Sequence, residues 1–281
     1  MNSFALNFTT KETASPIIKW AGGKRQLLPE LKSRLPQSYN RYFEPFIGGG
    51  ALFFDLAPEN AYISDVNEEL INLYKTVRNN LPELISDLSV HQNLPEYYSQ
   101  IRALDRTQEY SMLSNVKRAS RFIYLNKTCF NGLYRVNSKG FFNVPFGRYQ
   151  NPKLLDKENL YTAANILKQT QIECATFDNI LNFVKKNDFV YFDPPYIPLT
   201  ETSSFTSYSK ENFATKDHLA LKNLCDKLDC LGVKFMLSNS DTPKSRELYS
   251  SYKIDKIYAN RFINSKSTGR GKISEIIVTN Y

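Results

Sequence analysis

The sequence predicts an α/β fold, in which one mostly parallel sheet carries helices on its faces and a mostly helical insert. Three observations support this. Short apolar runs typical of buried strands alternate with segments of helical periodicity. A glycine-rich turn joins the first such strand to a helix, as in ligand-binding α/β sheets. A long helical stretch also separates the second strand from the later ones. The 281 residues, 42% of them hydrophobic, suffice for one large domain or a core domain with a smaller one.

The N-terminal part supplies two strands and then the helical stretch. "RYFEPFIGGGALFFDL" (41–56) predicts a strand, a glycine turn and the start of a helix, and "AYISDVN" (61–67) a short strand that ends in an acid. "EELINLYKTVRNNLPELISDLSV" (68–90) has apolar residues at helical spacing. Residues from about 68 to 128 are expected to be mostly helical, including "SNVKRASRFIYLNK" (114–127).

The C-terminal part supplies the remaining strands. These are "TQIECATF" (170–177), "DFVYFD" (188–193) and "GVKFMLSNS" (232–240), with a helix at "KDHLALKNLCDKLDCL" (216–231), and "KIYANRF" (256–262) with "ISEIIVTNY" (273–281) as an antiparallel pair. We therefore expect a core domain formed by residues 1–67 and 157–281. Residues 68–156 form the inserted second domain.

Composition excludes several classes of protein. The first residues, "MNSFALNFTTKETA", lack the basic start and apolar core of a signal peptide, and no run approaches a membrane span. We interpret them as a short mobile tail. Four cysteines without CxxC spacing and only two histidines argue against a disulfide framework or a metal site. A cytoplasmic protein without a membrane association or a metal is expected.

The net charge of +8 is concentrated in one segment. Residues 117–153 contain no acid and eight basic residues: Lys117, Arg118, Arg121, Lys127, Arg135, Lys139, Arg148 and Lys153. A solvated basic face is the simplest interpretation. However, aromatic and amide side chains are interleaved in "YLNKTCFNGLYRVNSKGFFNVPFGRYQNP", and such groups stack on bases and read their edges. Nucleic acid is therefore the leading candidate partner.

The glycine turn Gly48-Gly49-Gly50 is a candidate ligand site. Glycines after a strand let backbone amides approach a ligand closely. The glycines are consecutive, so the turn does not match GxGxxG and a dinucleotide site is disfavoured. Asp65, at the end of the next strand, is placed to bind the ribose hydroxyls of an adenosine ligand. The alternatives are a purely structural turn and, for Asp65, the N-cap of the helix that starts near Asn67.

The preceding segment, "IIKWAGGKRQLL" (17–28), contains Trp20, the only tryptophan. Arg25 follows Lys24 where a P-loop requires Ser or Thr, which argues against binding of a nucleoside triphosphate. Trp20 is either a core residue or, together with Lys24, part of a site for an adenine ring and a carboxylate.

The motif Asp193-Pro194-Pro195-Tyr196 ends a buried strand. Two prolines would by themselves explain a strand-ending turn, but an acid and an aromatic residue beside them indicate chemistry. The exocyclic amine of adenine is a poor nucleophile because its lone pair is conjugated with the ring. A carboxylate and a backbone carbonyl that accept its two hydrogens would favour tetrahedral nitrogen and expose the lone pair, while the tyrosine stacks on a base flipped out of the duplex.

The motifs WAGGK, FEPFIGGG, DVN, NGLYRVNSKGFFNVPFGRY and DPPY occur in this order from about residue 15 onward. With them the chain resembles the Dam/DpnM family of DNA adenine-N6 methyltransferases. The resemblance implies a Rossmann-like methyltransferase sheet that uses S-adenosylmethionine, with an inserted target-recognition domain. It also implies methylation of the adenine in GATC of double-stranded DNA, without a metal.

The resemblance further implies roles for individual residues. The catalytic positions are Asp193, Pro194 through its carbonyl, and Tyr196; the cofactor positions are Trp20, Lys24, Gly48, Gly50, Asp65, Phe177 and Asp193; the DNA-contact positions are Lys19, Phe130, Leu133, Arg135, Asn137, Pro145, Arg148 and Tyr149. Many relatives carry an acid before the residue that matches Phe177. This chain has Thr176 there and Asp178 after it, and either could accept a hydrogen bond from the cofactor adenine.

Two basic or polar loops and several alternative functions complete these expectations. The polar stretch 197–215 is interpreted as a loop that closes over the flipped base, or as an ordinary surface loop. Arg261, Lys266, Arg270 and Lys272 are candidate phosphate contacts or part of a solvated loop.

No cysteine follows a proline, which disfavours cytosine-carbon methylation. The alternatives are adenine methylation in another DNA motif, methylation of RNA bases or protein glutamines, and non-catalytic DNA binding. A bacterial or phage protein is expected, monomeric or weakly dimeric, which is either an orphan enzyme or accompanied by a restriction endonuclease in function but not in a complex.

Overall fold

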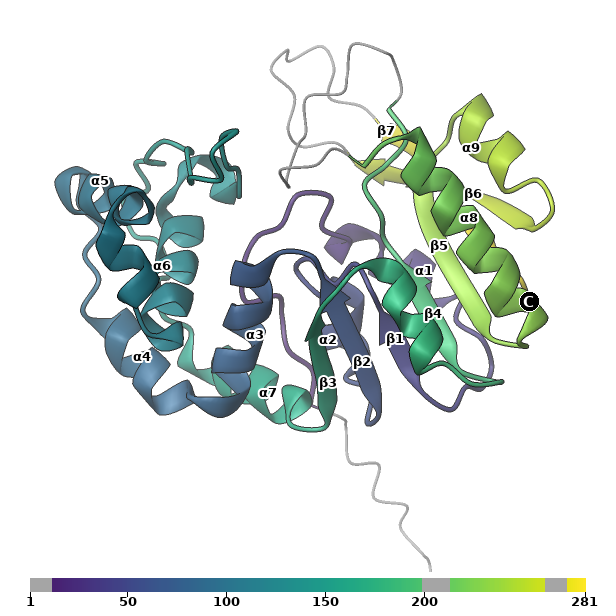
Figure 1. Cartoon of the computed structure of the whole chain (residues 1–281), viewed down its shortest axis with the longest axis horizontal. Helices are drawn as coiled ribbons and strands as arrows, with labels where there is room; N and C mark the ends of the chain where they lie inside the picture. Colours follow the sequence, from purple (N-terminus) through teal and green to yellow (C-terminus); the bar gives the residue numbers. More distant parts are fainter. Residues whose placement is uncertain (1–11, 199–212, 261–271) are drawn as a thin grey trace, which may run out of the picture.

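A computed structural model describes residues 12–198, 213–260 and 272–281 of the protein (Figure 1). Three expectations fall wholly or partly outside these residues: the mobile N-terminal tail, most of the loop 197–215, and the basic loop that contains Arg261, Lys266 and Arg270.

Seven strands form one sheet in the order β3-β2-β1-β4-β5-β7-β6. The strands are β1 (Tyr42–Glu44), β2 (Ala61–Asp65), β3 (Thr170–Cys174), β4 (Phe189–Phe192), β5 (Lys234–Ser240), β6 (Lys253–Asn260) and β7 (Lys272–Thr279). The first five in the sheet are parallel, and β7 runs antiparallel between β5 and β6. The predicted α/β fold is confirmed, including its C-terminal antiparallel pair.

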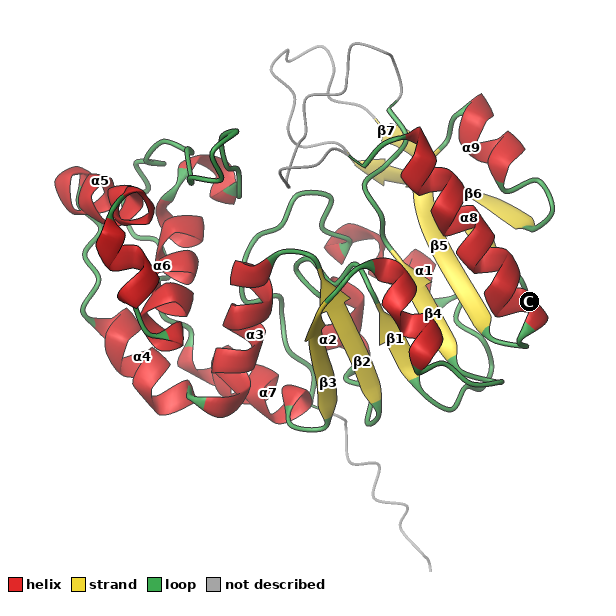
Figure 2. Cartoon of the chain, in the orientation of Figure 1, coloured by secondary structure: helices red, strands yellow, loops and turns green. Residues whose placement is uncertain are grey.

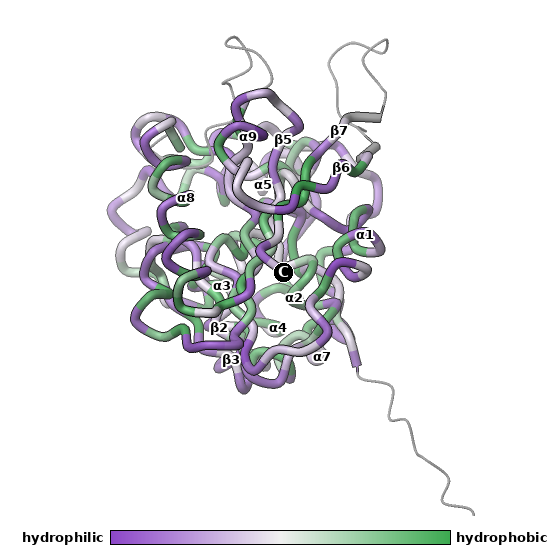
Figure 3. The backbone as a smooth tube through the Cα atoms, turned by 90° about the vertical axis from the view of Figure 1, so that its right-hand side faces the viewer, coloured by the Kyte–Doolittle hydropathy of each residue, from purple (hydrophilic) through white to green (hydrophobic). Residues whose placement is uncertain are grey.

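Helices cover both faces of the sheet because side chains alternate along each strand. The helices are α1 (Leu28–Lys32), α2 (Ala51–Leu56), α3 (Glu68–Asn79), α4 (Leu81–Ser89), α5 (Pro95–Ala103), α6 (Asn115–Thr128), α7 (Lys157–Leu167), α8 (Thr215–Cys230) and α9 (Pro243–Leu248). Tyr191 belongs to the hydrophobic cluster that α2, α3 and α7 share, whereas its neighbour Phe192 packs with α8. Hydrophobic residues accordingly gather toward the middle of the molecule (Figure 3).

The insert between β2 and β3 consists mainly of α4, α5 and α6, which lie apart from the sheet (Figure 2). The expected helical run 68–90 is divided at Asn80 into α3 and α4. Pro82 lies in the first turn of α4, where its missing N–H costs nothing. Helix α3 packs against α6 and also against β2 and β3, and thus joins the insert to the sheet.

The topology brings the predicted motifs to one edge of the sheet. β1 is hydrogen-bonded to β2 on one side and to β4 on the other, so the chain reverses its direction of winding there. Ligands of such sheets bind beyond the carboxyl ends of the strands at this point. The glycine turn follows β1, Asp65 ends β2 and Asp193 follows β4, so all three lie at the same edge. Among the described residues, no helix is long and apolar enough to cross a membrane.

Candidate active site

The glycine turn is held in place by the end of β2. Gly48 and Gly50 have φ values of +44° and +66°, which favour glycine. The Asp65 carboxylate accepts hydrogen bonds from the backbone N–H of Gly48 at 3.2 Å and of Asn67 at 3.0 Å. Tyr74 donates its hydroxyl hydrogen to the Gly48 carbonyl at 2.6 Å. The first backbone amide of the turn therefore points at the carboxylate that ends β2.

Asp65 is not the N-cap of the helix that follows. Asn67 has that role, because its side chain accepts a hydrogen bond from the Leu70 amide at 3.0 Å. Burial raises the pKa of Asp65 to about 6, although the backbone amides around it act in the opposite direction. A carboxylate that is partly desolvated at a strand end remains able to accept further hydrogen bonds.

Trp20 lies between the glycine turn and the insert. Its ring is half-buried and stacks on Tyr134, with 5.3 Å between ring centroids and 20° between planes. A Cβ atom added at Gly48 would lie 2.7 Å from Cδ1 of Trp20, a distance that side chains do not tolerate. The tryptophan thus requires glycine beside it, and it couples the turn to the insert.

Asp193 forms an ion pair with Lys24 at the carboxyl end of β4. The Lys24 Nζ atom lies 2.8 Å from Oδ1 of Asp193, donates to the Gly22 carbonyl at 2.6 Å, and lies 4.7 Å from the centroid of the Tyr196 ring. The Lys24 side chain is only 5% exposed. Burial raises the pKa of Asp193, Lys24 opposes this rise, and Glu275 adds to it. Lys24 therefore stabilises the ionised form of Asp193.

Side chains of two neighbouring strands, β5 and β7, form hydrogen bonds with the segment after Asp193. The backbone N–H of Ile197 donates to the side-chain oxygen of Asn239 at 3.0 Å, and the Ser240 hydroxyl donates to the Ile197 carbonyl at 2.6 Å. The Tyr196 hydroxyl donates to Oε2 of Glu275 at 2.7 Å. The motif is consequently fixed both through its backbone and through its tyrosine.

A buried carboxyl group lies under the site. Glu44 in β1 accepts a hydrogen bond from the Tyr42 hydroxyl at 2.6 Å, and both side chains are inaccessible to solvent. Burial raises the pKa of Glu44 from about 4.5 to about 8; Tyr42 and Lys24 lower it, and the charge of Asp193 raises it. Burial therefore favours the protonated form of Glu44, next to an Asp193 that is paired with Lys24.

Phe177 begins a short 3-10 helix (Phe177–Asn182) beyond β3 and stacks on Phe46, with ring centroids 5.4 Å apart. Both rings contact Phe213 at the start of the chain segment that leads into α8. Thr176 and Asp178 are both exposed on this edge.

Lys19 is tied to the insert through Asn126 of α6. The Asn126 side chain accepts from the Lys19 amide at 2.8 Å and donates to the carbonyls of Lys19, at 2.8 Å, and Gly132, at 3.0 Å. The Lys19 ammonium lies 5.5 Å from the centroid of the Tyr149 ring. Two expected DNA-contact residues are thus brought together from distant parts of the sequence.

Residues 130–147 form a hairpin-like loop that is closed by a bridge between Cys129 and Phe146. We call it the reading loop because it contains most of the expected DNA-contact positions. Phe130 is 52% exposed, and its N–H donates to the Pro145 carbonyl at 2.8 Å. Leu133 is half-buried and packs against the main core. The loop is therefore ordered by its own backbone and still presents an aromatic side chain to solvent.

Polar side chains at the tip of this loop have local partners. The Asn137 side-chain oxygen accepts from the backbone N–H groups of Lys139 and Phe141, both at 3.0 Å. Its amide oxygen therefore shapes the turn. Arg135 is exposed, and its Nε donates to the Asn143 side chain at 2.8 Å.

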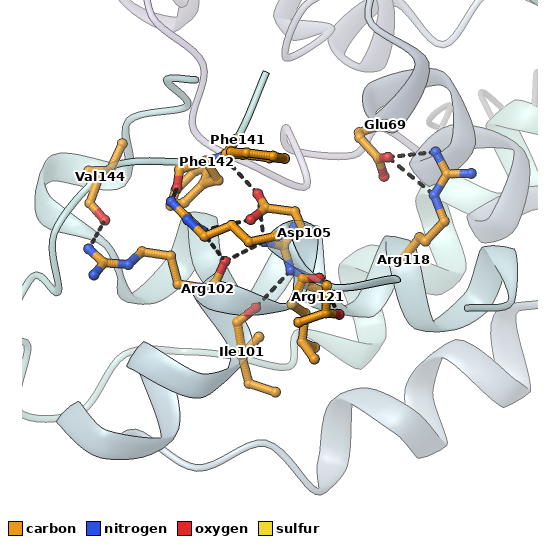
Figure 4. A network of polar contacts seen from close by, with 12 residues as sticks. Glu69, Ile101, Arg102, Asp105, Arg118, Arg121, Phe141, Phe142 and Val144 are labelled. Atoms are coloured by element: carbon orange, nitrogen blue, oxygen red, sulfur yellow. Dashed lines mark hydrogen bonds and ion pairs between the residues drawn. The ribbon is translucent and has the colours of Figure 1, made fainter. Parts of the chain in front are cut away.

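Asp105 anchors the loop to the helices behind it (Figure 4). Its carboxylate accepts from the Phe142 amide at 2.7 Å and pairs with Arg121 of α6 at 3.0 Å. Arg106 pairs with the same carboxylate at 2.7 Å and donates to the Phe142 carbonyl at 2.8 Å. Arg102 reaches the Val144 carbonyl at 3.4 Å. Asp105, Arg106 and Arg102 thus bind the backbone of the loop at Phe142 and Val144.

These contacts divide the basic segment into two groups. Three of its eight cations are paired with acids outside it: Arg118 with Glu69, Arg121 with Asp105, and Lys153 with Asp156. None of the other five (Lys117, Lys127, Arg135, Lys139 and Arg148) forms an ion pair with a described residue.

A cleft of about 620 Å³ opens beside the loop. It is lined by Asn93, Pro95, Tyr98, Ser99, Arg102, Pro145, Phe146, Arg148, Tyr149 and Gln150. Three of the expected DNA-contact residues, Pro145, Arg148 and Tyr149, therefore share one depression with α5. Among the described residues, no group of three or more His, Cys, Asp or Glu is arranged to hold a metal.

Sequence reasoning missed Glu44, Asp105, Asn126 and Glu275. Glu44 lies inside a motif that was considered only for its glycines. The other three act on partners 37 to 107 residues away, as in the contacts Asp105–Phe142, Asn126–Lys19 and Glu275–Tyr196. No local pattern marks such pairs.

Comparison with known proteins identifies the family of this chain. Residues 20–263 match the family described as D12 class N6 adenine-specific DNA methyltransferase. The chain is 51% identical over 270 residues to the type II methyltransferase M1.LlaDCHI of Lactococcus lactis subsp. cremoris, covering 95% of each chain. It is 43% identical to the type II methyltransferase M.MjaIII of Methanocaldococcus jannaschii over 95% of this chain and 99% of the relative. It is 33% identical to a DNA adenine methylase of Vibrio cholerae, over 92% and 94%. The chain belongs to the D12 class of N6 adenine-specific DNA methyltransferases.

Proposed function

We propose that this enzyme transfers a methyl group from S-adenosylmethionine to the N6 amine of an adenine flipped out of double-stranded DNA, within GATC. The observation that carries the proposal is the position of Asp193. It follows β4 at the carboxyl edge of the sheet, beside the glycine turn, in a segment fixed by β5 and β7. A rigid acceptor at this point is what activation of an exocyclic amine requires.

The residues at this edge fit the cofactor. Gly48 and Gly50 have positive φ values that favour glycine, Trp20 packs against Gly48, and Asp65 offers a carboxylate for ribose hydroxyls. Phe46 and Phe177 supply an aromatic wall, and Lys24 lies beside Asp193 at the same edge. When bound there, S-adenosylmethionine supplies an electrophilic methyl group. The protein's contribution is to hold this methyl group in line with the N6 amine of the adenine.

The chain's own residues prepare the amine. Asp193 and the Pro194 carbonyl accept its two hydrogens, and Tyr196 stacks on the base. The Lys24 ammonium lies 2.8 Å from Oδ1 of Asp193 and 4.7 Å from the centroid of the Tyr196 ring. It favours the ionised form of Asp193, which is the form that can accept the amine hydrogens. The amine proton passes to water after transfer, because no strong base is needed.

The inserted segment, residues 68–156, reads the DNA, and residues 1–67 with 157–281 perform the chemistry. Lys19, Phe130, Leu133, Arg135, Asn137, Pro145, Arg148 and Tyr149 are proposed as DNA contacts. Phe130 is exposed enough to enter the duplex, and Arg135 presents a guanidinium suited to guanine. Base flipping is required because the amine of a paired adenine cannot reach Asp193.

The proposal extends to partners. The names of two relatives, type II methyltransferases, support a role beside a restriction endonuclease that acts on the same DNA without forming a complex. A monomer or weak dimer suffices, because a palindrome can be methylated in two separate events. Another DNA motif is the main alternative. RNA or protein glutamine substrates are less well supported, because the tetrad begins with Asp and the reading segment is basic.

The test is single-molecule sequencing of unmethylated plasmid after incubation with the full chain and S-adenosylmethionine. Modified adenine confined to GATC is expected. Asp193→Ala should abolish modification while DNA binding is retained, because the residue contacts the base only after flipping. Modified adenine in another motif would overturn the GATC assignment. A wild-type protein that binds the cofactor but modifies no DNA would overturn the proposed reaction.

A further inference from the structure

Two residues that lie opposite each other in β5 and β7 form hydrogen bonds with the end of the motif that contains Asp193 and with the residue after it. Ser240 of β5 lies opposite Glu275 of β7 in the antiparallel ladder. From these paired positions the Ser240 hydroxyl binds the Ile197 carbonyl at 2.6 Å, and the Glu275 carboxylate binds the Tyr196 hydroxyl at 2.7 Å. The Tyr196 side chain and the backbone of Ile197, the residue after the motif, are thus held by two residues that lie opposite each other in the ladder.

The two contacts restrain different parts of the motif. Ser240 and Asn239 are almost completely buried, and both bind the backbone of Ile197. They set the path of the chain, but leave the Tyr196 ring free to turn about its side-chain bonds. Among the residues that the structure describes, Glu275 is the hydrogen-bond partner that restrains the far end of that ring. Tyr196 is half-buried, so packing alone covers only part of it.

We propose that Glu275 is a positioning residue that sets the orientation of the Tyr196 ring for stacking on the target adenine. This inference rests on the proposed function of the site. A hydrogen bond from a phenol to a carboxylate is short and directional, and therefore fixes the ring more firmly than a neutral partner would. The Lys24 ammonium lies 4.7 Å from the centroid of the same ring. The ring must keep its orientation when the base arrives and stacks on it.

The effect of Glu275 on catalysis passes through one hydroxyl group. Removing either partner of the hydrogen bond should therefore have the same consequence, and removing both should add nothing further. A glutamine in place of Glu275 keeps an acceptor oxygen for the hydroxyl and should restore most of the function. A general structural role for Glu275 would show neither pattern.

The experiment measures single-turnover methylation of an adenine-containing duplex by the wild-type chain, Glu275→Ala, Glu275→Gln, Tyr196→Phe and the double variant Glu275→Ala/Tyr196→Phe. Fluorescence of 2-aminopurine at the target position reports stacking of the flipped base. Glu173→Gln, which changes an acid in β3 at the opposite side of the sheet, serves as the control.

Glu275→Ala and Tyr196→Phe should each slow methylation about tenfold, with DNA and cofactor affinities unchanged and 2-aminopurine fluorescence raised. The double variant should match either single variant, and Glu275→Gln should stay within about threefold of wild type. Multiplied losses in the double variant, a Glu275→Gln rate as low as that of Glu275→Ala, or full activity of Glu275→Ala would each overturn the inference. An inactive wild-type chain would instead count against the proposed function.

Discussion

Single carboxyl groups determine how this active edge responds to pH. Glu44, Asp65 and Asp193 all have pKa values raised by burial, but their neighbours differ. Asp193 has the ammonium of Lys24 at 2.8 Å, whereas Glu44 has only the Tyr42 hydroxyl as a close side-chain partner. Lys24 thus favours the ionised form of Asp193, which can bind hydrogens, whereas burial favours the neutral form of Glu44 beneath it. If both were charged, their repulsion would weaken the site.

We predict that the free energy of unfolding falls less with rising pH in Glu44→Gln than in the wild type. Between about pH 4.5 and about pH 8 the unfolded chain releases the Glu44 proton while the folded chain keeps it. The free energy of unfolding therefore falls as pH rises through this range. Glutamine has no such proton, so the fall should be smaller by roughly 1 to 4 kcal/mol.

Urea unfolding of the wild type and the variant near both ends of this pH range measures the difference. Asp65 and Asp193 titrate in both proteins, so that comparing the two slopes isolates Glu44. The same pH dependence in both proteins would show that Glu44 is ionised in the folded chain.

The reading loop depends on elements that lie behind it. The sequence predicted α6 and the basic loop, but not that Asp105, just after α5, would bind the loop backbone at Phe142. The side chain of Asp105 is 9% exposed and is shared by Arg106 and Arg121. One acid thus orders a loop and pairs with two cations, of which Arg121 belongs to the basic segment that composition alone would assign to DNA.

We predict that Asp105→Asn loosens the reading loop and relaxes DNA discrimination. The amide can still accept from Phe142 but no longer balances the buried Arg121, so stability should fall by about 1 to 3 kcal/mol. Methylation of the cognate site should require more DNA. The ratio of cognate to single-mismatch rates should fall severalfold, because reading residues such as Arg135 are held less firmly.

Steady-state kinetics on matched duplexes, together with cofactor affinity, provide the measurement. Asp87→Asn, on α4 of the same insert and without a hydrogen bond to the loop, is the control. Loss of cofactor binding in Asp105→Asn, or unchanged discrimination, would disprove a role for Asp105 in DNA reading.

At the scale of the whole molecule, sequence patterns predicted the architecture but not the pairing of its parts. Strand periodicity, the glycine turn and DPPY were local and visible, and the sheet places them at one edge. The contacts of Glu275 with Tyr196 and of Asn126 with Lys19 arise only when distant elements meet. Predictions from charge have the same limit, because composition gives only the number of cations. Which of them are paired with an acid depends on the fold.

The fold therefore predicts that cations of the basic segment contribute unequally to DNA affinity. Lys139 is exposed at the tip of the reading loop, whereas Arg118 is paired with Glu69 of α3. Each cation that neutralises a phosphate adds about 0.9 to the slope of log affinity against log salt concentration. Lys139→Gln should lower that slope by about 0.9 on every DNA sequence, and Arg118→Gln should leave it unchanged. Fluorescence anisotropy of a labelled duplex over a range of salt concentrations measures both slopes. Equal reductions in the two variants would mean that the Glu69 pair opens on DNA and that Arg118 is released to the phosphate backbone.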